Sequence, residues 1–198
     1  MRNKFDMQLD LLNEQLTHMG ELCEVAINRG TEALKKGDLK QAAEVIRADE
    51  EIDQMEKDVE RLCLKLLLQQ QPVARDLRQI SAALKMERIG DQASDIAEII
   101  ISENKSEATD IQTIGQMSES VAKMVRDSVN AYVEKDLELS RQVMEADDAV
   151  DRLFEENKQE LINFISDNKG VQGKRAIDLI MVAKYLERIG DHATNIAE

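Results

Sequence analysis

The chain repeats part of its own sequence at an interval of 100 residues. Residues 87–98, ERIGDQASDIAE, recur as residues 187–198, ERIGDHATNIAE, with nine of the twelve positions identical. Further upstream, ADEEID at residues 48–53 matches ADDAVD at residues 146–151. Self-similarity at a fixed interval indicates tandem copies of one structural unit. We therefore expect two halves of the same fold.

Both halves have the composition of long helices. The chain has one proline and 3% aromatic residues, and good helix formers such as Leu, Ala, Glu, Lys, Gln and Met dominate it. Runs of β-branched residues with period 2 are absent. We predict an all-α protein with six long antiparallel helices, spanning about Phe5–Lys36, Leu39–Gln70, Val73–Glu103, Ile111–Lys135, Leu137–Asp167 and Lys174 to the end.

The repeat divides these helices into two tandem three-helix bundles. We predict a first bundle at residues 1–103, a polar linker at 104–110 and a second bundle at 111–198. Turns are predicted at Gly37–Asp38, where a C-cap glycine precedes an N-cap aspartate, and at Gln71–Pro72. The chain stops within the repeated motif, so we expect the last helix to be truncated.

Charge and composition exclude several classes of function. The chain has 26 basic and 40 acidic side chains, which gives a net charge of −14. Such an acidic chain has no basic stripe for nucleic acid. No apolar run approaches the ~20 residues of a membrane span, so we expect no membrane insertion. The N-terminus has no signal peptide and the two cysteines form no disulfide framework, so we expect a cytoplasmic location.

Each half carries two pairs of carboxylates. Asp49 and Asp53 lie on the second predicted helix, and Glu87 and Asp91 lie on the third. Their spacing of i, i+4 places both members of a pair on one helix face, where like charges repel. If neighbouring helices bring two pairs together, a cation between them relieves this repulsion. The counterparts in the second half are Asp147, Asp151, Glu187 and Asp191.

Two interpretations of these pairs stay open at the level of residues. Oxygen ligands suit hard cations such as Mg²⁺, Ca²⁺, Mn²⁺ or iron, and the recurrence of the pairs indicates two similar sites. In so acidic a chain, the same pairs are also typical of a solvated helix face. Gly90 and Gly190, in the middle of predicted helices, allow either close packing of helices or space for an ion.

No catalytic arrangement is visible. The chain has no Glu-x-x-His pair of a di-iron carboxylate bundle, no phosphate-binding glycine loop and no nucleophile beside a base. Cys23 and Cys63 lie inside helices and are interpreted as small buried hydrophobic residues. We predict that the protein is not an enzyme and has no catalytic or organic cofactor site.

The sequence resembles the PhoU family over essentially its whole length. The resemblance is carried by Met19–Gly20, by QPVARDLR at residues 71–78 and above all by the doubled Glu-Arg-Ile-Gly-Asp. These family members are accessory regulators of the bacterial phosphate-specific transport system. The resemblance implies two three-helix bundles with metal clusters held by paired (Glu/Asp)-x-x-x-Asp motifs. Carried over, the metal ligands are Asp49, Asp53, Glu87, Asp91, Asp147, Asp151, Glu187 and Asp191.

The implied function is negative regulation of phosphate uptake and of the phosphate-starvation response. The implied partners are the ATPase subunit of the phosphate ABC transporter and a phosphate sensor histidine kinase, and we also expect a homodimer. The metal stays open among iron, Mg²⁺, Mn²⁺ and Zn²⁺. The alternative is a metal-free helical adaptor whose acidic faces dock basic surfaces of partner proteins.

Overall fold

The computed structural model describes residues 2–69, 74–103, 112–167 and 172–198. Within these ranges the chain forms helices and no strand, which confirms the all-α prediction. The predicted turn at 71–72, the predicted linker at 104–110 and most of the predicted loop at 168–173 lie outside the described residues. The helices are α1 Arg2–Lys36, α2 Leu39–Gln69, α3 Ala74–Glu103, α4 Gln112–Glu134, α5 Leu137–Asp167 and α6 Gly173–Ala197.

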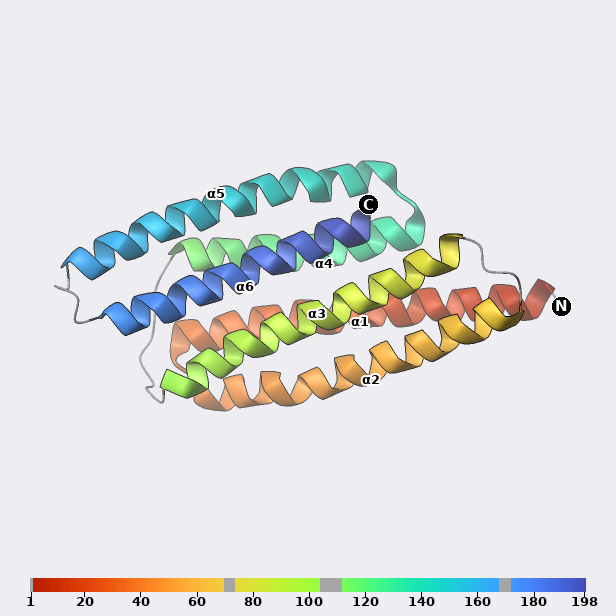
Figure 1. The fold of residues 1–198 in the computed structure, drawn as a ribbon, viewed down its shortest axis with the longest axis horizontal. Helices are drawn as coiled ribbons and strands as arrows, with labels where there is room; N and C mark the ends of the chain where they lie inside the picture. Colours follow the sequence, from red (N-terminus) through yellow and green to blue (C-terminus); the bar gives the residue numbers. More distant parts are fainter. Residues whose placement is uncertain (1, 70–73, 104–111, 168–171) are drawn as a thin grey trace.

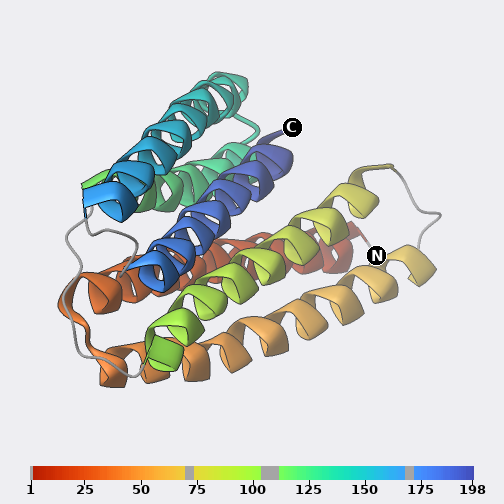
Figure 2. The same cartoon turned by 60° about the vertical axis from the view of Figure 1, so that its left-hand side comes forward.

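The two halves lie side by side and share their packing. Each half is a bundle in which all three helices contact one another (Figure 1). Between the halves, α1 packs against α4 and α3 packs against α6. The helices α1, α3, α4 and α6 thus form a central group, and α2 and α5 flank it on the outside (Figure 2). Each outer helix is therefore free to present one face to solvent.

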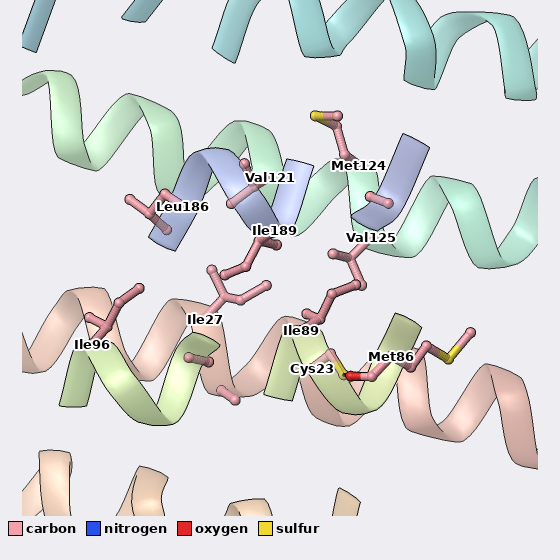
Figure 3. Packing of buried hydrophobic residues seen from close by; sticks show 14 of the residues in the cluster. Cys23, Ile27, Met86, Ile89, Ile96, Val121, Met124, Val125, Leu186 and Ile189 are labelled. Carbon is pink, nitrogen blue, oxygen red and sulfur yellow. Dashed lines mark hydrogen bonds between the residues drawn. The ribbon is translucent and has the colours of Figure 1, made fainter. Parts of the chain in front are cut away.

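The hydrophobic core is continuous across both halves. Figure 3 shows side chains of all four central helices meeting there, among them Ile27, Ile89, Val125 and Ile189. The side chains of these four residues are fully buried. The inner face of α2 carries an apolar stripe as well, in which Val45, Ile52 and Val59 are buried. Burial of these stripes is the main force that holds long helices together.

The turns between the first two helices of each half are built alike. In the first half Gly37 has φ 65°, a conformation that suits glycine, and Asp38 Oδ1 accepts two backbone N–H bonds of the next helical turn at 3.0 Å. In the second half Asp136 Oδ1 accepts two such bonds at 2.9 and 3.0 Å, and Lys135 takes φ 58°. The predicted caps are therefore confirmed in both halves.

The two cysteines behave as the sequence predicts. Neither Cys23 nor Cys63 forms a disulfide, both are buried, and the Cys23 thiol donates a hydrogen bond to the Met86 carbonyl at 3.3 Å (Figure 3). Burial raises the pKa of Cys23 to about 12, so the thiol stays protonated. We also find, in the described helices, none with the length and apolar character needed to cross a membrane.

Candidate metal centre

Helices α2 and α3 bring three predicted ligands together. Asp49 and Asp53 lie one turn apart on α2, and Asp91 faces them from α3. One carboxylate oxygen from each lies within 4.8 Å of the other two. The fourth predicted ligand, Glu87, lies one turn before Asp91 on α3, and burial together with the charge of Asp91 raises the pKa of Glu87. We call these four residues the first acidic cluster.

Three carboxylates of the first acidic cluster, those of Asp49, Glu87 and Asp91, have a raised pKa. Burial raises the pKa of Asp49 to about 6, and the charges of Asp91 and Asp53 add to the rise. A hydrogen bond from Ser94 opposes it. Burial is also the largest cause of the raised pKa of Asp91 and Glu87. Without a cation, this site is an unfavourable concentration of negative charge.

Gly90 lets the two helices meet at this cluster. A Cβ at position 90 would lie 2.8 Å from Asp49 Oδ1 and 3.1 Å from two carbons of Ile52. Ile52 is 1% exposed, so it has little room to move. The missing side chain therefore serves the predicted close packing of helices, and the predicted space for an ion stays a prediction. This glycine allows close packing of α2 on α3, and it leaves space for the Asp49 carboxylate beside the helix.

The second half repeats this arrangement between α5 and α6. Burial raises the pKa of Asp147 to about 6, and Asp191 and Asp151 contribute next. A Cβ at Gly190 would lie 3.0 Å from Asp147 Oδ1. We call Asp147, Asp151, Glu187 and Asp191 the second acidic cluster. Its four carboxylates, all in the described part of the chain, include no trio as compact as that of the first cluster.

Two residues at these clusters were not predicted from the sequence. Ser94 hydrogen-bonds to Asp49 in the first half. In the second half Lys184 Nζ lies 2.7 and 2.6 Å from the two carboxylate oxygens of Glu187. Position 84, the counterpart of Lys184 in the repeat, is a leucine. Comparison of the two repeats one helical turn before the glutamate would have found this difference.

The first acidic cluster has the chemistry of a site for a hard cation. Its donors are carboxylate oxygens, which Mg²⁺, Mn²⁺ and iron accept. Asp49 Oδ1 is buried and has no hydrogen-bond partner, so no hydrogen bond compensates the negative charge on that oxygen. A divalent cation held by Asp49, Asp53 and Asp91 would compensate the negative charge of these carboxylates. The residues present therefore fit a bound metal.

Comparison with known proteins matches both halves of the chain. A family model described as the PhoU domain matches residues 16–100 and again residues 114–198. The chain belongs to the PhoU family. Each PhoU match covers the three helices of one half, so the repeat and the family unit coincide.

Relatives of PhoU type align over the whole chain. A protein of Clostridium acetobutylicum, named a phosphate-specific transport system accessory protein PhoU homolog, is 39% identical over all of this chain and 92% of its own length. A relative of the same name from Aquifex aeolicus is 39% identical over 93% of this chain and 86% of its own length. The crystal structure of PhoU from Pseudomonas aeruginosa matches with a TM-score of 0.87 and 33% identity, covering 98% of this chain and 95% of that chain. The fold predicted from the repeat is therefore the fold of the family.

Proposed function

We propose that this protein is a non-enzymatic, cytoplasmic regulator of phosphate uptake and of the phosphate-starvation response. It acts between the ATPase subunit of a phosphate ABC transporter and a sensor histidine kinase, as a homodimer, and limits uptake when phosphate is ample. The observation that carries this proposal is the full-length similarity to proteins named as accessory proteins of phosphate-specific transport.

Exposed acidic helix faces supply the surface for such contacts. Asp91, Asp151 and Asp191 are exposed, and the chain as a whole carries a net charge of −14. Long-range attraction to basic surfaces increases the rate of encounter and weakens as salt is added. Metal bound by the paired (Glu/Asp)-x-x-x-Asp motifs removes part of this local charge. Metal occupancy then adjusts the affinity for a basic partner.

The regulatory proposal is tested by deleting the gene in its host. We expect phosphate-starvation genes to stay expressed in ample phosphate, and the wild-type gene to restore repression. Normal repression in the deletion strain would contradict the regulatory role.

The docking surface is tested with purified transporter ATPase subunit. A double charge reversal, Asp53→Lys with Asp91→Lys, should weaken binding at low salt by at least about tenfold, because attraction between unlike charges becomes repulsion. The control is Asp10→Lys with Glu14→Lys, which changes charge equally at two exposed positions of α1 with different neighbours. Equal binding by both variants would contradict docking through the acidic cluster.

The metal-free adaptor is the alternative outcome of the same binding experiment. An adaptor of that kind binds the partner equally well before and after chelation. Under the present proposal, chelation changes the affinity for the partner, because the local charge of the acidic faces changes with metal occupancy.

A further inference from the structure

The two acidic clusters differ at two positions that the repeat aligns. Glu56 of α2 corresponds to Phe154 of α5, at the interval of 98 residues that aligns these helices. Leu84 of α3 corresponds to Lys184 of α6, at the interval of 100 residues. At these two positions together, the second half has one negative charge fewer and one positive charge more than the first.

Lys184 is placed so that its charge acts on the second cluster. Its ammonium group lies within hydrogen-bond distance of both carboxylate oxygens of Glu187, at 2.7 and 2.6 Å. The same ammonium group lies 5.4 Å from the centre of the Phe154 ring, within reach of a cation–π interaction. The side chain of Glu187 is only 15% exposed, whereas that of Lys184 is 38% exposed, so the pair is half-buried on its carboxylate side. Both oxygens of a predicted metal ligand are thus already held by a cation of the chain itself.

The first cluster has no lysine at the position of Lys184. The cation that acts on its Glu87 and Asp91 is Arg88, whose counterpart Arg188 likewise acts on Asp191. Leu84, which takes the place of Lys184, is 45% exposed and uncharged. Glu56, which takes the place of Phe154, adds a carboxylate whose charge acts on Glu87. Asp49 Oδ1 is a buried oxygen without a hydrogen-bond partner, and Asp147, its counterpart, has no such oxygen in the structure.

We propose that the two clusters are unequal metal sites: Lys184 substitutes for a metal ion at the second cluster, so divalent cations bind preferentially at the first. The inference rests on the proposed metal binding and deepens it. A cation that enters the second cluster must displace an ammonium group or bind beside it, and both are costly because like charges repel at short range. A cation that enters the first cluster has no ammonium group at position 84 to displace.

The test exchanges the aligned residues between the two halves of the full-length protein. Metal-free protein is dialysed against Mn²⁺ alone, and the bound Mn²⁺ is counted by elemental analysis over a range of concentrations. In the wild type, we expect tight binding at one cluster. Lys184→Leu gives the second half the residue that the first half has at this position. We expect this variant to gain tight sites, so that more Mn²⁺ ions are tightly bound per chain. Leu84→Lys does the reverse, and we expect the tight affinity to fall by at least about tenfold.

Lys158→Leu is the matched control. Lys158 lies over the same Phe154 ring at 5.1 Å but pairs with Glu155, which is not a predicted ligand. We expect this variant to bind Mn²⁺ as the wild type does, and thermal melts of each variant check that the fold is kept. Leu84 and Lys184 are both partly exposed, so either exchange is compatible with the core.

The results that overturn the inference also show whether the inequality of the two clusters or the metal binding itself is wrong. Equal tight binding at both clusters of the wild type, or no gain of tight sites in Lys184→Leu, overturns the inequality and leaves the proposed metal binding intact. Absence of Mn²⁺ binding in the wild type and in every variant overturns the proposed metal binding together with the inequality.

Discussion

At the scale of single residues, a glycine lies opposite an aspartate in each pair of acidic helices. Gly90 and Gly190 occupy the same place in the two repeats, and each lies against an aspartate of the neighbouring helix. Glycine in the middle of a helix costs about 1 kcal/mol relative to alanine. The structure gives a reason for accepting this cost, because a methyl group would press on the carboxylate at both positions.

Alanine substitutions at three glycines should rank in a defined order. At Gly90 a Cβ meets Asp49 at 2.8 Å and Ile52 at 3.1 Å, at Gly190 it meets Asp147 at 3.0 Å, and at Gly173 it meets nothing within 4 Å. We expect Gly90→Ala to lower the free energy of unfolding by about 1 kcal/mol, since crowding outweighs the gain in helix propensity. Gly190→Ala should lower the free energy of unfolding by less, and Gly173→Ala should not lower it. Urea denaturation measures the order, and a Gly90→Ala variant more stable than the wild type would contradict it.

The raised pKa of Asp49 predicts an unusual dependence of stability on pH. Its folded-state pKa of about 6 lies above the ordinary value of 3.8, so the folded protein holds an extra proton between these values. The stabilisation that protonated Asp49 contributes to the folded state is therefore complete below about pH 4 and is lost as the pH rises through 6. In chelated protein, Asp49→Asn should raise the melting temperature at pH 7.5 by a few degrees and change it little at pH 4.

The matched control for this pH experiment is Asp10→Asn, at an exposed position of α1. It should leave the melting temperature nearly unchanged at both pH values. A gain from Asp49→Asn that is equal at pH 4 and pH 7.5 would show that titration of Asp49 is not its cause.

At the scale of elements, the turns between helices differ in one residue. Gly37 and Lys135 both have positive φ, at 65° and 58°, and only glycine adopts this conformation without steric cost. Lys135→Gly should therefore raise the free energy of unfolding by about 1 kcal/mol, and Gly37→Lys should lower it by a similar amount. Urea denaturation of both variants checks this. The assigned strain would be contradicted if Lys135→Gly gave no gain in stability and Gly37→Lys gave no loss.

Helices and caps were predictable because their signals are local. The aspartates at 38 and 136 cap helices where the sequence predicts, and the i, i+4 pairs do face a neighbouring helix. The packing of α3 on α6 was not predicted, since a repeat specifies two similar units and not how they contact each other. The role of Lys184 was missed because it depends on a position where the two repeats differ, one helical turn before the glutamate.

At the scale of the whole molecule, the core does not depend on the acidic clusters. Buried side chains of the central helices form one continuous cluster, in contrast to a zinc finger, which lacks a core of its own. We expect circular dichroism of exhaustively chelated protein to keep the helical signal of the untreated protein. Collapse of that signal to that of a random coil would show that metal is required for folding.

The location of bound metal tests directly whether the first acidic cluster is a metal centre. Crystals of metal-free full-length protein are soaked in Mn²⁺, and anomalous scattering then locates each ion. We predict an anomalous peak between α2 and α3, within about 2.6 Å of carboxylate oxygens of Asp49, Asp53 and Asp91. Anomalous peaks only at other places, or none with Mn²⁺ well above its dissociation constant in solution, would contradict a metal centre at this cluster.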